Sequence, residues 1–168
     1  MLKAYSKFMN VVEKIVETLL WVSLVTMVLA MLYQVVLRYI FNSSNVWSEE
    51  LSCFLFAYVV MLGAALATRK GGHLQVDFLI NLLNPKMKSI SVIVSTIAGI
   101  AFLLFFMRYA IILCQSTTNS ISTGLKIPMS YVYACLPFGG GLMVLSSIEV
   151  ILKSIETIKQ YEAAGGAK

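Results

Sequence analysis

The chain has 168 residues, of which 59% are hydrophobic and 12% are charged, and its formal net charge is +5. A soluble domain usually carries about 25% charged residues, so this composition excludes a water-soluble globule. The positive balance does not indicate a nucleic-acid-binding protein, because no compact basic domain carries it. The remaining class is an integral membrane protein built from apolar helices.

Apolar runs of roughly twenty residues predict transmembrane helices. The runs cover residues 15–37, 51–67, 90–114 and 129–152. Each is long enough to cross a hydrocarbon layer of roughly 30 Å, the second only just. The first run is too long for the core of a signal peptide and lacks a small-residue cleavage site after it, so we expect it to remain attached. The sequence predicts one all-α domain over residues 1–168, a four-transmembrane-helix bundle.

Basic residues are distributed unevenly among the connections. Lysines precede the first run and follow the fourth, and further basic residues lie between the second and third runs: Arg69, Lys70, Lys86 and Lys88. The other two connections hold only Arg38 and Lys126. Because basic residues stay on the cytoplasmic side of the bilayer, we expect both termini and the middle connection in the cytoplasm.

The first outer connection concentrates charge. Arg38 closes the first run, and Glu49 and Glu50 open the second. Charges near hydrocarbon are usually paired, so one interpretation is an ion pair between Arg38 and either glutamate, with Arg108 of the third run nearby. A second is a docking surface for a partner, and a third is ordinary solvation at the membrane surface. Trp47 is expected at the headgroup level, where it anchors the start of the second helix.

A second set of charges is expected on the cytoplasmic side. Arg69 ends the second run and Glu149 lies in the last turn of the fourth, while Glu13 and Glu17 lie near the start of the first. We expect Arg69 to pair with Glu149 or Glu17 across the bundle. The alternative is that each side chain reaches the membrane surface independently.

Small residues predict places of close helix packing. Gly63 and Ala67 lie four residues apart in the second run, which would let a neighbouring backbone approach closely. In the fourth run, Pro137 precedes the glycines at 139–141, and this combination predicts a kink or a tight packing site.

Residues 73–83 of the middle connection, beginning at His73, predict a short amphipathic helix on the inner membrane surface. The alternative is a helix buried against a partner subunit. No acidic residue lies in the middle of any run, and no histidine lies within one. We therefore expect neither a catalytic site nor a metal or cofactor site, and the chain is interpreted as an accessory or scaffolding subunit.

Several short segments together resemble one family, the DctQ-type small membrane subunit of tripartite ATP-independent periplasmic (TRAP) transporters. The segments, in chain order, are RYIF (38–41), WSEE (47–50), GAA (63–65), RKGGH (69–73), VD (76–77), TGLKIP (123–128) and LP (136–137). The resemblance covers nearly the whole chain and includes the four-span layout.

The resemblance implies a bacterial inner-membrane complex that imports organic acids such as C4-dicarboxylates or sialic acids. It implies that a periplasmic binding protein delivers the acid and that a large multispanning subunit moves it with sodium. The small subunit would scaffold the large one and help receive the binding protein. Trp47, Glu49 and Glu50 would then lie at the periplasmic end, and Arg69 and His73 at the cytoplasmic end, as structural or interface residues.

Two other functions compete with this one. A self-sufficient homo-oligomeric transporter would be expected to carry a carboxylate at mid-depth, which the runs lack. A membrane anchor of a redox enzyme would usually need axial histidines within the spans, and these are also missing.

Overall fold

The computed structural model describes residues 2–43, 45–69 and 85–163. Its helices are α1 (Leu2–Ile40), α2 (Val46–Arg69), α4 (Pro85–Ser116), α5 (Met129–Tyr133) and α6 (Cys135–Ala163). Within these described ranges, four stretches are long and apolar enough to cross a membrane: α1, α2, α4, and α5 together with α6. The expected all-α membrane fold is confirmed. The helix expected at 73–83, with His73, lies outside the described residues.

The helices run further than the apolar patterns alone indicate. The first expected span covers 15–37, whereas α1 covers Leu2–Ile40. The third covers 90–114, whereas α4 covers Pro85–Ser116. An apolar run marks only the part of a helix that lies in hydrocarbon. Backbone hydrogen bonding continues into the headgroup zones, and with these zones the total thickness of the bilayer is roughly 40–45 Å.

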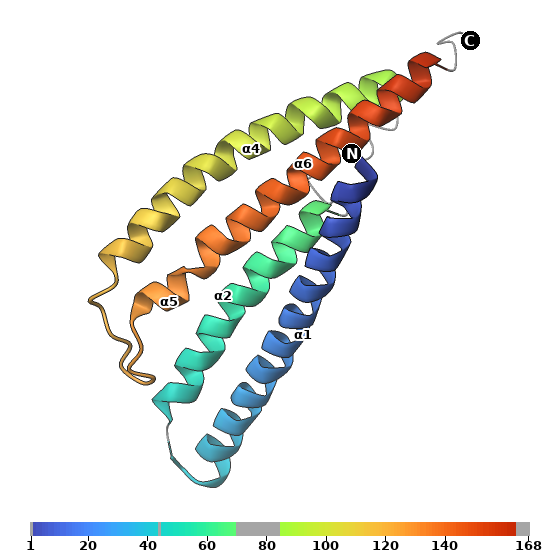
Figure 1. Cartoon of the computed structure of the whole chain (residues 1–168). Helices are drawn as coiled ribbons and strands as arrows, with labels where there is room; N and C mark the ends of the chain where they lie inside the picture. Colours follow the sequence, from blue (N-terminus) through green and yellow to red (C-terminus); the bar gives the residue numbers. More distant parts are fainter. Residues whose placement is uncertain (1, 44, 70–84, 164–168) are drawn as a thin grey trace.

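The long helices lie side by side in the order α4, α6, α2, α1 (Figure 1). Helix α2 packs against α1 and α6, and α6 packs in turn against α4. Helices α1 and α4 therefore form the two flanks of an open row. The α1–α2 and α4–α5 connections lie at one end, called here the loop end. The start of α1 and the close of α6 lie at the other, called the terminal end (Figure 1).

The row leaves most large apolar side chains exposed. Trp21 and Leu29 on α1 and Phe102 and Phe105 on α4 are each more than half exposed. Lipid tails are as apolar as these side chains, so a membrane helix gains little by hiding them. Between the helices, the buried contacts are made largely by small or polar residues such as Ser48, Ala65 and Ser147.

Pro137 accounts for the interruption between α5 and α6. Its missing N–H removes the bond that would reach the carbonyl of Tyr133, the last residue of α5. Normal helical bonds resume on either side, since Ala134 donates to Ser130 O at 3.0 Å and Phe138 donates to Ala134 O at 3.2 Å. The fourth span is thus interrupted just before Pro137, and the interruption is confined to Ala134.

The glycines after Pro137 are places of close packing. A Cβ built on Gly139 would lie 2.8 Å from Met61 Cβ of α2. One built on Gly140 would lie 2.9 Å from Met107 Cγ of α4. At Gly63, by contrast, the nearest atom is Leu20 Cδ1 at 3.7 Å, which is ordinary contact. The close approach expected at Gly63 is thus not found among the described residues, because its Cβ position faces a side chain and not a backbone.

Replacing Gly139 with alanine is expected to destabilise the helix row. The added methyl group meets Met61 Cβ and its carbonyl oxygen, which cannot move without shifting α2. Overpacking of this kind costs about 1–3 kcal/mol. The matched control is Gly141→Ala, where nothing lies within 4 Å. Thermal unfolding of the detergent-purified protein should give a lower midpoint for Gly139→Ala only; equal midpoints would contradict the packing argument.

Candidate functional site

Arg69, the last residue of α2, is the centre of a polar cluster at the terminal end. Its Nε donates to Glu149 Oε2 of α6 at 2.7 Å, and its Nη2 contacts Glu149 Oε1 at 3.3 Å. Nη1 pairs with Glu13 of α1, and Nη2 donates to Asn10 Oδ1 at 2.5 Å. One guanidinium therefore links three helices. Its fork of fixed N–H directions suits this task, because each carboxylate meets a separate donor.

The carboxylate of Glu149 is the most enclosed charge of this cluster. Its side chain is 2% exposed and that of Arg69 is 8% exposed. Lys153, one turn further along α6, places Nζ 2.8 Å from Glu149 Oε1. A buried carboxylate requires such partners, since an unpaired charge away from water is strongly destabilising. The terminal-end cluster comprises Asn10, Glu13, Arg69, Glu149 and Lys153.

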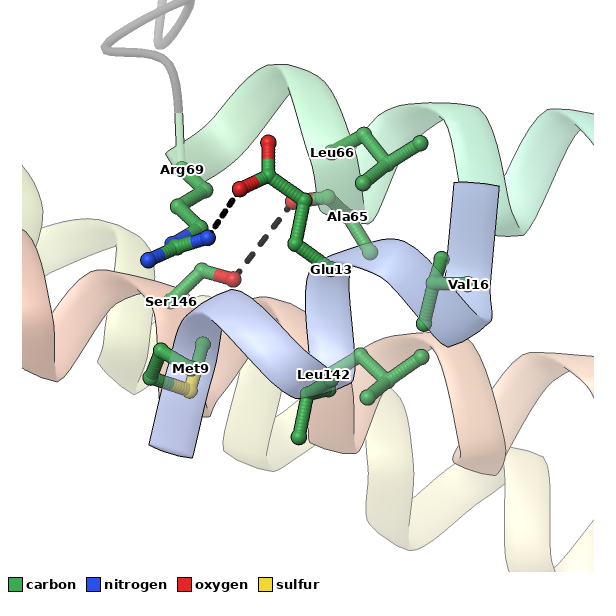
Figure 2. Close-up of a pocket in the computed structure, with 9 residues that line it drawn as sticks. Met9, Glu13, Val16, Ala65, Leu66, Arg69, Leu142 and Ser146 are labelled. Atoms are coloured by element: carbon green, nitrogen blue, oxygen red, sulfur yellow. Dashed lines mark hydrogen bonds and ion pairs between the residues drawn. The ribbon is translucent and has the colours of Figure 1, made fainter. Parts of the chain in front are cut away.

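Apolar packing surrounds the cluster and leaves little free space. Figure 2 shows Met9 and Val16 of α1, Leu66 of α2 and Leu142 of α6 around the Arg69–Glu13 pair. The cavity between these side chains has a volume of about 10 Å³. A water molecule needs roughly 10–15 Å³ by this measure. The space is a packing gap, not a substrate site.

Two further bonds tie the same helices together near the cluster. Tyr5 of α1 donates its hydroxyl to Leu145 O of α6 at 2.9 Å. Ser146 Oγ lies 3.5 Å from Ala65 O of α2, as the second dashed line in Figure 2 shows. The terminal end of the row is thus held by polar contacts among α1, α2 and α6.

Glu50, in the first turns of α2, is the centre of a second cluster at the loop end. Its Oε1 accepts a bond from Thr123 Oγ1 at 2.6 Å, and its Oε2 accepts from Ser122 Oγ. The backbone N–H groups of Gly124 and Leu125 also donate to Oε2, at 2.9 and 3.1 Å. A single carboxylate therefore holds the turn between α4 and α5.

The turn itself is built to approach Glu50 closely. Ser122 N donates to Ile127 O at 3.0 Å and Met129 N donates to Ser120 O at 2.8 Å, which closes the segment into a narrow loop. A Cβ on Gly124 would lie 2.9 Å from Trp47 Cα and from Glu50 Oε2, so only glycine fits there. The loop-end cluster comprises Glu50, Ser122, Thr123, Gly124 and Leu125.

The expected ion pair between Arg38 and a glutamate is wrong among the described residues. Glu50 is held by the α4–α5 turn, and the exposed Glu49 accepts a bond from Gln34 Nε2 at 3.4 Å. Arg38, in the last turn of α1, is exposed and makes no ion pair within the described part of the chain. The hydroxyl and backbone N–H donors of the turn thus occupy Glu50 in place of Arg38, the partner that charge alone suggested.

The sequence profile of the family described as "Tripartite ATP-independent periplasmic transporters, DctQ component" matches residues 27–157. The chain belongs to this family. A "Putative TRAP transporter small permease protein" of Haemophilus influenzae is 30% identical over 77% of this chain and 78% of its own length. The "Sialic acid TRAP transporter small permease protein SiaQ" of Vibrio cholerae is 28% identical over 94% of this chain and 89% of its own length.

A longer relative extends the comparison. The "Sialic acid TRAP transporter permease protein SiaT" of Haemophilus influenzae is 28% identical over 92% of this chain. The matched part is only 25% of the length of SiaT, so this TRAP small permease spans a quarter of that relative. The chain is a TRAP transporter component that crosses the membrane several times.

The pairing expected for Arg69 of this TRAP small permease is correct for Glu149 and wrong for Glu17. The second carboxylate is Glu13, one turn nearer the start of α1, while Glu17 is exposed. Arg69 is the last residue of α2, and the antiparallel α1 runs alongside it. The guanidinium therefore lies at the height of Glu13 along α1 and not at the height of Glu17. The sequence indicates the sign of each charge and its side of the membrane, but not which residue of α1 lies at the same height as Arg69 of α2.

The remaining predicted residues serve packing or lie on the surface. The ring of Trp47 in α2 lies 5.7 Å from that of Tyr33 in α1, which joins these helices near the loop end. Arg108 is exposed on α4. Cys53, Cys114 and Cys135 are free thiols.

Sequence reasoning missed the donors of the α4–α5 turn. Ser122 is almost fully buried and Thr123 is exposed, although both bond Glu50. In the sequence, the segment TGLKIP (123–128) indicates a resemblance to the TRAP family but does not by itself identify a partner for Glu50. A Ser-Thr-Gly run carries hydroxyls and a flexible backbone, which is typical of turns that bind a carboxylate.

Proposed function

We propose that this chain is the small, non-catalytic membrane subunit of a sodium-driven, binding-protein-dependent importer of organic acids. It scaffolds the large transport subunit in the bilayer and offers its loop end to the periplasmic binding protein. The chain itself neither binds the transported acid nor uses the sodium gradient; both belong to the large subunit.

The observation that carries the scaffolding role is the way in which polar side chains are used. Arg69 and Glu149 join helices, and Glu50 fixes a turn. These groups already have partners inside the chain. The cavity beside Arg69, about 10 Å³, is too small to admit a carboxylate substrate. An arrangement that immobilises three helices supports a fixed frame and not a moving carrier.

The relatives support the class of substrate and the partner. Several of their names specify sialic acid, C4-dicarboxylate or isethionate transport. These compounds are all organic acids that are anionic at neutral pH, so the shared class is an organic anion. The match to this chain covers only 25% of SiaT and 17% of the "Isethionate TRAP transporter permease protein DctMQ". Both relatives are therefore much longer than the matched segment. That excess length favours a large permease subunit as the partner of this chain.

The distribution of basic residues supports the orientation. In this proposal both termini lie in the cytoplasm of a bacterium and the chain lies in the inner membrane. The loop end, with Glu50 and Trp47, then faces the periplasm. The terminal-end cluster lies on the cytoplasmic side, where the bonds of Arg69 hold the frame.

A tagged copy of this chain, extracted from native membranes in mild detergent, is expected to bring down a large multispanning permease in a fixed ratio. Mass spectrometry of the eluted proteins measures this. The untagged strain is the control for proteins that adhere to the resin. Recovery of the chain only with copies of itself would contradict the proposal and favour the homo-oligomeric transporter.

A further inference from the structure

Arg108 is a charge within a membrane-spanning helix that no carboxylate of the described residues neutralises. It lies about two turns, or roughly 12 Å, before the end of α4 at Ser116. Its side chain is exposed and makes no hydrogen bond or ion pair within the part of the chain that the structure describes. A charge at such a depth faces hydrocarbon unless a partner or the headgroups reach it.

The position of Arg108 on α4 is opposite the contact with α6. Leu103 and Ala110, seven residues apart, are buried on the contact side. At about 100° per residue, Arg108 lies about 140° around the helix from Leu103. Its neighbours on the outward side include Leu104 and Ile112, which are 54% and 48% exposed. These three residues define the Arg108 face.

No carboxylate among the described residues is available to Arg108. Glu50 is held by the α4–α5 turn, and Glu49 lies with it on α2. Helix α6 separates α2 from α4 in the row (Figure 1). The residues around Arg108 are apolar, so a water-soluble partner would leave them in an unfavourable environment. Charge and apolarity together fit one kind of occupant, a membrane helix with an acidic side chain.

We infer that the Arg108 face of α4 is covered by a transmembrane helix of the large permease subunit that carries an aspartate or glutamate level with Arg108. This inference rests on the proposed function, since it names the surface through which the scaffold holds its partner. Arg38 does not mark a comparable surface on α1. It lies in the last turn of its helix, where water and headgroups can solvate it.

Site-specific photo-crosslinking in the otherwise unchanged complex tests the face directly. A photoreactive phenylalanine analogue at Leu104 or Ile112 is expected to crosslink to the large permease. The matched controls are Phe102 and Tyr109 on the same helix, 68% and 66% exposed. They lie about 120° and 100° around the helix from Arg108, and their crosslinking yield should be several-fold lower. Equal yields from both sets, or crosslinks only to another copy of this chain, would overturn the inference.

Substitution of Arg108 tests the charge. Arg108→Ala should reduce recovery of the large permease at least about tenfold, because it leaves a buried carboxylate of the partner unpaired. Arg108→Lys should retain more of the large permease, and Lys126→Ala, which removes an exposed charge in the α4–α5 turn, should leave the recovery of the permease unchanged. Normal recovery with Arg108→Ala would mean that the arginine only reaches lipid headgroups. Absence of the permease from the unmodified sample would instead overturn the proposed function itself.

Discussion

Replacing Arg69 with alanine is expected to lower the free energy of unfolding by about 3–5 kcal/mol, the effect of removing one partner from a buried ion pair. Glu149, 2% exposed, would retain only Lys153 of its two cationic partners. Glu13 and Asn10 would lose the group that joins α1 to α2. Thermal unfolding in detergent, followed by size-exclusion chromatography of the remaining native protein, measures the change.

Companion variants separate the loss of the ion pairs from a general loss of charge. Arg38→Ala removes an exposed arginine without an ion pair among the described residues and should leave the midpoint unchanged. Arg69→Lys should have an unfolding midpoint between those of the wild type and Arg69→Ala, because a single ammonium cannot reproduce the separate donors of the guanidinium. Combining Arg69→Met with Glu149→Met should recover part of the loss, since no buried charge is then unpaired. A wild-type midpoint for Arg69→Ala would show that the cluster does not hold the helices.

Replacing Glu50 with alanine is expected to release the α4–α5 turn from α2. The change removes the acceptor for the hydroxyls of Ser122 and Thr123 and for two backbone N–H groups. Lys126, exposed within this turn, provides a site for trypsin. Cleavage after Lys126 in the detergent-purified protein should become several-fold faster, because proteolysis follows the population of the opened segment. Mass spectrometry of the fragments identifies the cut.

Glu49→Ala is the matched control for this experiment. Glu49 adjoins Glu50 on the same helix, but its only bond among the described residues is the 3.4 Å contact from Gln34. For Glu50→Gln, the rate of cleavage after Lys126 should lie between those of the wild type and Glu50→Ala. The amide oxygen can still accept bonds from Gly124 and Leu125, but it lacks the full charge of a carboxylate. If Glu49→Ala and Glu50→Ala speed cleavage equally, the turn is not held by Glu50.

The membrane-spanning helices could be predicted because the bilayer imposes a simple requirement. Any stretch that crosses hydrocarbon must be apolar and must satisfy its backbone internally, so long apolar runs indicate helices directly. The interruption at Ala134 was also predictable, because Pro137 removes one specific donor. The open-row order of the helices was not, since a helix with lipid around it shows no clear apolar face.

The polar clusters were predictable only in part. Arg69 and Glu149 end apolar runs on the same side of the bilayer, and this proximity suggested their bond. Choosing Glu13 over Glu17 requires the axial level of α1 against α2, which no residue type encodes. Of the four donors to Glu50, the hydroxyls of Ser122 and Thr123 could be read as turn residues, but the N–H groups of Gly124 and Leu125 could not be singled out, because backbone N–H groups belong to every sequence. Their convergence on one oxygen depends on the path of the turn.

The positions of the two clusters on α2 have a mechanical consequence. Glu50 lies in its first turns and Arg69 is its last residue, and each bonds to different neighbours. One residue of axial sliding is about 1.5 Å, and such a slip in either direction would lengthen bonds at both extremities together. Helix α2 is thus held at both of its ends, and its register against the rest of the bundle is set by these two clusters together with the bond that the Tyr58 hydroxyl, near its middle, donates to Tyr131 O of α5 at 2.6 Å.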